Sequence, residues 1–429
     1  MLAPLLGRSG FFRALAGAVG VALVGKRDVA WSSTGGSAGD LALPLQRCGG
    51  AFCASYSIDS QDFRAVVDTG SPFLLVDGSC AQRGRFGCFN STRSRSVFLG
   101  DTSEEGFGGE DIGVEWRRGA VTFSGQEFSP VNFGVVRTFV GKVGAGAIYL
   151  GLIKTRGARI RPTLLEQTEF RSMRFKLLGD KPLLTLSRRS LIKTSQDAVK
   201  IVDLRPLGCP FLPYSVKIDK ILVNGEPVPL QRPCVGIIDT GTTGLSMSSS
   251  LYDSDELPLP GAAIRTIELE LPTEQGRRVK LDASTRPRVT RQGSGGTTAS
   301  SQQQVFPLVV TPVEVPWFEP GFKANPTRKK DSPSLLGVTK SSGTDADGGS
   351  ARTTPRDLTQ VPHVLFIGLA FLSEVPELTI DMDALRMTIA QPLSSVPEPE
   401  ARIRRMTREA LDGTASVSQA PVTLYGRES

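Results

Sequence analysis

Two short stretches of this chain carry an acid–base group at the same kind of turn. Residues 66–71 read Val-Val-Asp-Thr-Gly-Ser, and residues 237–242 read Ile-Ile-Asp-Thr-Gly-Thr. In each, an apolar pair typical of a strand end precedes a turn in which glycine permits tight backbone geometry and the threonine hydroxyl can bond backbone. A single Asp-Thr-Gly would be an ordinary turn. Recurrence with matching flanks indicates one site built from two halves, with Asp68 and Asp239 facing each other.

These motifs and their surroundings give the chain a resemblance to the pepsin-like (A1-type) aspartic proteases. Tyr149-Leu150-Gly151 and Phe366-Ile367-Gly368 are similar to the hydrophobic-hydrophobic-Gly elements that the family places downstream of each triplet. Further segments that carry the likeness are residues 54–58 and 61–67, similar to the family's first hairpin, and residues 365–372, 378–381 and 387–390, similar to the closing strands of its second lobe. The resemblance covers roughly residues 41–392.

The resemblance implies an all-β chain with a bilobal fold, in which two pseudo-twofold-related, β-barrel-like lobes enclose a central cleft. Abundant glycine and proline, 46 and 29 residues, favour turns and a β-rich chain. The expected organisation is a signal or transit segment 1–30, a linker 31–40, an N-terminal lobe 41–169, an interlobe segment 170–206, a C-terminal lobe 207–392 with low-complexity insertions near 284–304 and 323–360, and a flexible tail 393–429.

By the same resemblance, Asp68 and Asp239 approach to hydrogen-bonding distance and share one proton, because like charges so close cannot both ionise easily. One carboxylate then acts as general base on a bound water, and the protonated one donates to the scissile carbonyl oxygen of an extended polypeptide substrate. No cofactor and no metal is expected. The supporting residues would be Thr69 and Thr240 as braces between the loops, Gly70 and Gly241 as points of close approach, and Ser71 and Thr242 as hydroxyl donors to the carboxylates.

A hairpin with an apolar arm and a charged tip is predicted at residues 113–122. In the family this position holds the flap, a mobile hairpin over the substrate that carries a tyrosine, and Trp116 stands nearest to that tyrosine here. The alternative is that Trp116 packs on the sheet. Leu75 stands where many family members have a tryptophan that pairs with the flap.

A formal net charge of +7 is compatible with nucleic-acid binding, but its distribution along the chain argues against that function. The excess of Arg and Lys lies in residues 1–30 and in the two insertions, and the remaining core is slightly acidic. No basic stripe interleaved with aromatics is present in the sequence. We therefore expect no nucleic-acid partner and a monomeric protein.

The six cysteines form an even set of three local pairs, which favours disulfides in an oxidising compartment. The alternative, a zinc site, is disfavoured because paired zinc-knuckle spacing is lacking and His363 is the single histidine. The family resemblance likens Cys80 and Cys88 to a small first-lobe disulfide loop. The three candidate pairs are Cys48 with Cys53, Cys80 with Cys88, and Cys209 with Cys234.

Residues 1–30 combine basic residues with an apolar run that is too short to span a bilayer, which is typical of a secretory signal. A mitochondrial or plastid transit peptide is the alternative. The first interpretation places the protein in the secretory pathway, outside the cell or in a vacuole- or lysosome-like compartment, without a stable membrane span in the mature chain. Asn90-Ser91-Thr92 is a glycosylation sequon if that pathway is used.

Two other functions compete with an aspartic endopeptidase. A peptide- or protein-binding protein without catalysis could use the same fold, because function resides in the site. A serine or cysteine hydrolase would need a base, and His363, the single histidine, lies in an apolar context.

Overall fold

The computed structural model describes residues 39–81, 83–107, 110–140, 148–156, 161–257, 264–285, 306–315 and 361–391. This part of the chain is mostly β, with several sheets and only short helices, which confirms the all-β expectation. The predicted signal or transit segment, nearly all of the linker and of the two insertions, and the tail lie outside the described residues.

The largest sheet contains thirteen strands, in the order β11-β22-β21-β9-β10-β1-β2-β6-β7-β4, with β3, β5 and β8 attached to this path. Its strands are β1 (Leu41–Arg47), β2 (Phe52–Ile58), β3 (Gln61–Asp68), β4 (Leu75–Asp77), β5 (Val97–Phe107), β6 (Glu110–Phe123), β7 (Gln126–Val140), β8 (Tyr149–Gly151), β9 (Ser172–Lys176), β10 (Leu183–Ser187), β11 (Val199–Lys200), β21 (Leu378–Asp381) and β22 (Arg386–Ile389).

Two smaller sheets come from the second half of the chain, in the orders β12-β15-β20-β16-β19 and β14-β13-β17-β18. Their strands are β12 (Ser215–Ile218), β13 (Lys220–Val223), β14 (Glu226–Pro227), β15 (Cys234–Ile238), β16 (Leu245–Ser248), β17 (Thr266–Pro272), β18 (Arg278–Ser284), β19 (Val310–Val313) and β20 (His363–Ile367). The helices are α1 (Arg83–Phe86), α2 (Ser249–Tyr252), α3 (Leu369–Leu372) and the 3-10 turns η1 (Ser91–Arg93), η2 (Leu165–Gln167) and η3 (Arg205–Leu207).

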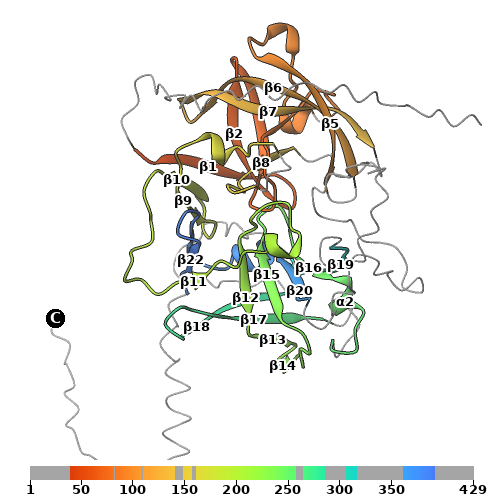
Figure 1. The fold of residues 1–429 in the computed structure, drawn as a ribbon, viewed down its shortest axis with the longest axis vertical. Coiled ribbons are helices and arrows are strands. Elements are labelled where there is room, and N and C mark those ends of the chain that lie inside the picture. Colours follow the sequence, from red (N-terminus) through yellow and green to blue (C-terminus); the bar gives the residue numbers. More distant parts are fainter. Residues whose placement is uncertain are drawn as a thin grey trace, which may run out of the picture.

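In Figure 1 the strands β1 to β8 lie in the upper part of the molecule and β12 to β20 in the lower part, with β9, β10 and β22 between them. Burial follows this arrangement. Strand β1 alternates buried and exposed residues, as a strand with one wet face does, whereas every residue of β15 and β20 is buried. The centre of the five-stranded sheet is therefore fully enclosed.

Several strand predictions are confirmed. Residues 54–58 and 61–67 form the β2–β3 hairpin. Residues 378–381 and 387–389 are strands as well, but β21 pairs with β9 rather than with the sheets of the second half. The last described strands thus extend the sheet that β1 and β10 begin.

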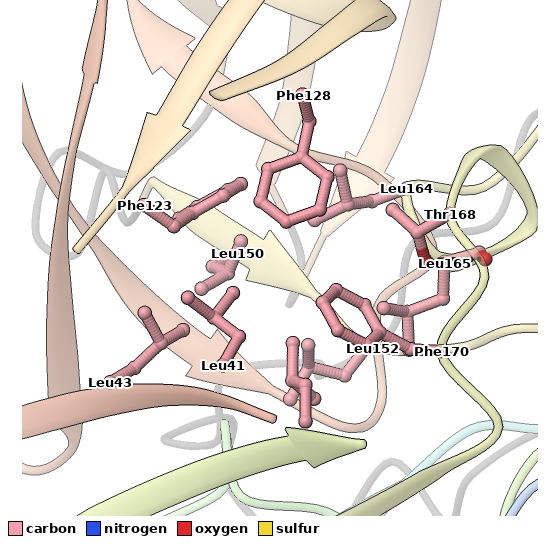
Figure 2. A pocket seen from close by; sticks show the side chains of 11 residues that line it. Leu41, Leu43, Phe123, Phe128, Leu150, Leu152, Leu164, Leu165, Thr168 and Phe170 are labelled. Atoms are coloured by element: carbon pink, nitrogen blue, oxygen red, sulfur yellow. Dashed lines mark hydrogen bonds between the residues drawn. The ribbon is translucent and has the colours of Figure 1, made fainter. Parts of the chain in front are cut away.

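An apolar pocket lies in the first half of the chain, behind the strand that ends in Gly151. Figure 2 shows its leucine and phenylalanine side chains, contributed by β1, β6 to β8, β10 and the η2 region. Thr168 is the single polar residue among those that line it. Because a ligand site needs converging polar groups to fix orientation, we assign this pocket to core packing.

The cysteines follow the sequence prediction for two of the three pairs. Cys48 is bonded to Cys53 and Cys80 to Cys88. The predicted third disulfide is wrong: Cys209 and Cys234 are free, buried thiols. Cys209 follows η3, beside the charges of Asp203 and Arg205, whereas Cys234 begins β15 beside Glu256 and Arg232, so the two thiols have different surroundings.

Candidate active site

Each aspartate lies at the end of a strand that pairs in parallel with a strand ending at a glycine. Asp68 closes β3 and is the register partner of Gly151 in β8. Asp239 follows β15, whose neighbour β20 leads into Gly368, and the Asp239 amide donates to the Ile367 carbonyl at 3.0 Å. The chain therefore builds the same local unit twice.

The two partner glycines allow the aspartate loops to fold back over these strands. A Cβ on Gly151 would lie 2.4 Å from the Phe73 nitrogen, and a Cβ on Gly368 would lie 2.4 Å from the Thr242 carbonyl oxygen. Real Cβ atoms do not approach backbone so closely. Both positions therefore require glycine for the close approach of two backbone segments.

The two aspartate loops, 171 residues apart in sequence, are joined by reciprocal hydrogen bonds. The Thr69 hydroxyl donates to the Ile238 carbonyl at 2.7 Å and accepts from the Thr240 amide at 3.0 Å. The Thr240 hydroxyl likewise donates to the Val67 carbonyl at 2.7 Å and accepts from the Thr69 amide at 3.1 Å. All four bonds are buried, so the two loops are held in one fixed relation.

This bracing places each loop's glycine against the opposite carboxylate. A Cβ on Gly70 would lie 2.9 Å from the carboxylate oxygens of Asp239, and a Cβ on Gly241 would lie 2.6 Å from the carboxylate of Asp68. Both glycines are thus points of close approach between the loops. Asp68 and Asp239 are brought together, with exposed fractions of 5% and 3%.

Hydrogen bonds from within each loop orient the two carboxylates. Asp68 accepts from the Gly70 amide at 2.7 Å and from the Ser71 hydroxyl at 2.6 Å. Asp239 accepts from the amides of Gly241 and Thr242 at 2.9 and 3.2 Å and from the Thr242 hydroxyl at 2.8 Å. The predicted hydroxyl donors therefore contact the carboxylates they were assigned to.

The electrostatic environment favours a shared proton. Burial, followed by the negative charge of Asp239, raises the pKa of Asp68 well above its usual range. Asp239 accepts one more backbone amide than Asp68 does. The arrangement can therefore hold one proton between the two carboxylates, and the titration belongs to the pair.

The hairpin predicted at residues 113–122 is wrong. These residues belong to the single strand β6, and the hairpin turns between Phe107 and Glu110, joining β5 to β6. The charged residues that were predicted to form the tip of a hairpin lie within the strand, where their side chains have partners. The Arg117 guanidinium donates hydrogen bonds to Glu115 and to the Ser96 hydroxyl. The Arg118 side chain donates to Asn132 in β7.

Trp116 is buried on the sheet, with 1% of its surface exposed, as the alternative interpretation predicted. Its ring meets Phe73 edge-on, with centroids 5.0 Å apart, and the Arg161 guanidinium lies 4.6 Å from the ring centroid. Phe73 lies two residues after Ser71, so Trp116 packs against the segment that follows the Asp68 loop. Leu75 is also buried, and its carbonyl oxygen accepts a hydrogen bond from the Tyr56 hydroxyl.

Sequence reasoning missed the polar residues on the inner side of the β5–β6 hairpin. The Trp116 indole donates to the Ser103 hydroxyl at 2.7 Å, which in turn donates to Glu105 at 2.7 Å. Glu105 is 5% exposed, and burial raises its pKa. The signal that could have located the hairpin is the cluster Gly106, Gly108 and Gly109, a stronger turn indicator than Arg117-Arg118-Gly119.

The remaining candidate residues lie away from the carboxylate pair. His363 begins β20, 1% exposed, with Nδ1 2.7 Å from the Arg232 guanidinium and Nε2 3.2 Å from Glu256. Its register partner is Cys234, whose pKa is raised by burial, so this thiol is poorly suited to act as a nucleophile.

Asn90 is exposed, and its side chain caps η1 by accepting from Thr92. Within the described ranges no three His, Cys, Asp or Glu side chains converge as a metal site, and no helix there is long and apolar enough to cross a membrane.

A scan of the chain against protein-family models and a search among curated proteins both found no match.

Proposed function

We propose that this protein is an aspartic-type endopeptidase that hydrolyses peptide bonds between Asp68 and Asp239, on a bilobal, pepsin-like fold. The observation that carries the proposal is the reciprocal bracing of the two loops by Thr69 and Thr240, which sets each glycine against the opposite carboxylate. A pair of ordinary turns would not need such contacts. Bracing of this kind holds two like charges together against their repulsion.

The reaction follows from the single proton that the pair shares. The ionised carboxylate takes a proton from a water located between Asp68 and Asp239. The protonated carboxylic acid donates to the carbonyl oxygen of the scissile peptide bond, and the raised pKa of Asp68 favours holding that proton in the pair. The tetrahedral gem-diol then collapses as a proton passes to the leaving amine. These are microstates of one coupled pair, whose titration belongs to both groups.

The β5–β6 hairpin is the element we assign to covering the substrate. It is joined to the Asp68 loop through the contact of Trp116 with Phe73. Such a cover excludes water and aligns an extended peptide over the two carboxylates. Trp116 then positions the hairpin rather than contacting the substrate.

The compartment we infer is an oxidising one, in the secretory pathway. Two disulfides staple the first half of the chain, and such bonds persist outside reducing compartments.

The decisive test is cleavage of a quenched peptide library from about pH 3 to pH 7, which spans acidic conditions that favour a shared proton and neutral conditions that do not. Wild-type protein is compared with Asp68→Asn and Asp239→Asn, and Asp62→Asn serves as the matched control because Asp62 is an exposed aspartate on the same strand as Asp68. We expect cleavage favoured by acid, lost in both site variants and retained in the control. A peptide with a secondary alcohol in place of the scissile amide should inhibit, because it mimics the gem-diol.

Two outcomes would contradict the proposal. Cleavage that survives both substitutions would place the chemistry elsewhere. Saturable peptide binding by folded wild-type protein without cleavage would support the alternative, a binding protein that does not catalyse.

A further inference from the structure

Exposed large apolar side chains gather at one place in the described part of the chain. Three of the five are consecutive, Val97, Phe98 and Leu99, with exposed fractions of 64%, 46% and 36%. They begin β5, and the other two, Leu178 and Val309, stand singly. Isolated exposed apolar residues are common on protein surfaces, but three in succession call for a partner.

The backbone at this point bulges away from the sheet. The pairing of β5 with β6 includes Val97 and Phe98 and resumes at Thr102 after a register shift, so the residues between them leave the ladder. Gly100 has a φ of +73°, and nothing lies within 4 Å of the position its Cβ would take. Within the described sheet β5 pairs with β6 alone, so the segment 97–100, here named the apolar bulge, projects from a sheet edge.

Arginines precede the apolar bulge in the sequence and face it across the strand pair. Between Gly78 and Gly100 the chain carries Arg83, Arg85, Arg93 and Arg95 and no acidic residue. Arg93 and Arg95 are exposed directly before the bulge, and the exposed Arg118 is the register partner of Val97 on β6.

Two nearby acids offset part of this charge. Asp59 accepts hydrogen bonds from the Ser94 hydroxyl and the Arg95 amide, and so sits close to the bulge. Asp101 is ion-paired with Arg161 and leaves no excess negative charge. The single negative charge of Asp59 is outweighed by the three positive charges of Arg93, Arg95 and Arg118. The surface around the apolar bulge therefore carries a net positive charge.

We propose that the apolar bulge and its flanking arginines form a docking surface for an anionic lipid membrane. The apolar side chains enter the boundary between headgroups and acyl chains, and the guanidinium groups of Arg93, Arg95 and Arg118 contact lipid phosphates. A bulged, twisted edge resists the addition of a further strand, so a second copy of the chain is the less suitable occupant. The proposal does not depend on the proteolytic function.

Co-sedimentation of the full chain with vesicles tests the surface. We expect binding to vesicles of phosphatidylcholine with phosphatidylserine, weaker binding to phosphatidylcholine alone, and weakening by salt. The double variant Phe98→Ser, Leu99→Ser should lose about tenfold in affinity. Its matched control, Leu178→Ser with Val309→Ser, removes two other exposed apolar residues and should bind as wild type.

The arginines are tested separately. Each of Arg93→Gln and Arg95→Gln should weaken binding by about fivefold, because one basic residue near an anionic surface contributes about that factor. Arg265→Gln, an exposed arginine on the second half of the chain, is the control and should have no effect.

A spectroscopic readout locates the contact whatever other segment also touches lipid. Compared with the wild type, which has three tryptophans of its own, Phe98→Trp should add blue-shifted emission on anionic vesicles that brominated acyl chains quench, whereas Leu178→Trp should add neither. Unchanged binding by the Phe98→Ser, Leu99→Ser variant, or no quenching at position 98, would overturn the proposal. Self-association that this variant abolishes, without vesicle binding by wild type, would also overturn it and identify the bulge as a contact between copies.

Discussion

In the first half of the chain Asp68 closes β3 beside Gly151, and in the second half Asp239 follows β15 beside Gly368. The loops correspond bond for bond where they meet, because each threonine donates to the other loop's strand and accepts from the other threonine's amide. They differ in how they hold their carboxylates, since Asp239 accepts two backbone amides and Asp68 one. Symmetry thus sets the position of the pair, whereas the hydrogen bonds to each carboxylate are not symmetric.

The difference grows with distance from the loops. The first half carries two disulfides and the long β5–β6 hairpin, whereas the second half has two buried thiols. Burial raises the pKa of Cys209 to about 12, so this thiol stays protonated at physiological pH. Only the inner parts of the two halves are therefore constrained to match.

The largest effect is expected where the two halves touch. Gly241→Ala would bring a methyl group to 2.6 Å from the Asp68 carboxylate, and Gly70→Ala to 2.9 Å from Asp239. Displacing a catalytic group by a fraction of an ångström to 1 Å can cost about a hundredfold in rate, so both variants should lose about that much kcat/KM. The measurement is steady-state cleavage of a peptide that the wild type turns over. Full activity of Gly241→Ala would contradict the close approach of the loops.

The next effect concerns the braces. Thr69→Val and Thr240→Val each remove a hydroxyl that makes two buried hydrogen bonds and leave an amide and a carbonyl unpaired. Each should lower the free energy of unfolding by about 2 to 4 kcal/mol, measured by chemical denaturation. The double variant should lose less than the sum, because the four bonds act together. Thr69→Ser and Thr240→Ser keep the hydroxyl and should stay near wild type. Equal losses in the serine and valine variants would mean that packing, not bracing, matters here.

A smaller effect is expected in the pH dependence of stability. Burial and Asp239 raise the pKa of Asp68, so its neutral form is the one the fold favours. Its contribution is therefore fully present below the unfolded-state pKa and is lost as pH rises through the raised folded-state pKa. Asp68→Asn removes this dependence, so the variant should gain stability relative to wild type on going from pH 4 to pH 7. A tenfold difference in proton affinity between the folded and unfolded states corresponds to about 1.4 kcal/mol. A constant difference in unfolding free energy across that range would refute the raised pKa of Asp68.

The smallest effect tests the asymmetry itself. Ser71→Ala removes a donor to Asp68, which makes the protonated form persist to higher pH, so the alkaline limb of the activity profile should move upward. Thr242→Val removes the corresponding hydroxyl donor to Asp239 and makes the matching change in the other loop. Activity at the optimum should fall by about tenfold or less, because one hydrogen bond to a carboxylate contributes about 1.5 kcal/mol. An unmoved alkaline limb in Ser71→Ala would contradict the role of the Ser71 hydroxyl in lowering the pKa of Asp68.

The site was more predictable than its surroundings. The repeated Asp-Thr-Gly motif located both carboxylates and their hydroxyl donors because those contacts are made within four residues of each aspartate. The hairpin was misplaced because Arg117 looks like a solvent-exposed tip in sequence, and only the folded sheet supplies the partners Glu115 and Ser96 that keep it within β6.

Long-range pairing was the other limit of the sequence. Cys209 and Cys234 are close along the chain, but strand pairing places Cys234 beside His363 in β20. In the same way, the pattern at residues 378–381 predicts a strand without disclosing that its partner is β9. Such partners are chosen by burial across the whole fold, which no local pattern encodes.

The pairing of β21 with β9 also bears on how the protein assembles during synthesis. Until residues 378–389 have left the ribosome, β9 remains an open edge, although β10 and β1 are ready beside it. A nascent chain that ends before this point exposes unpaired backbone to its neighbours, which favours aggregation. The two halves therefore cannot be completed one after the other, and the last strands to emerge close the sheet begun by the first.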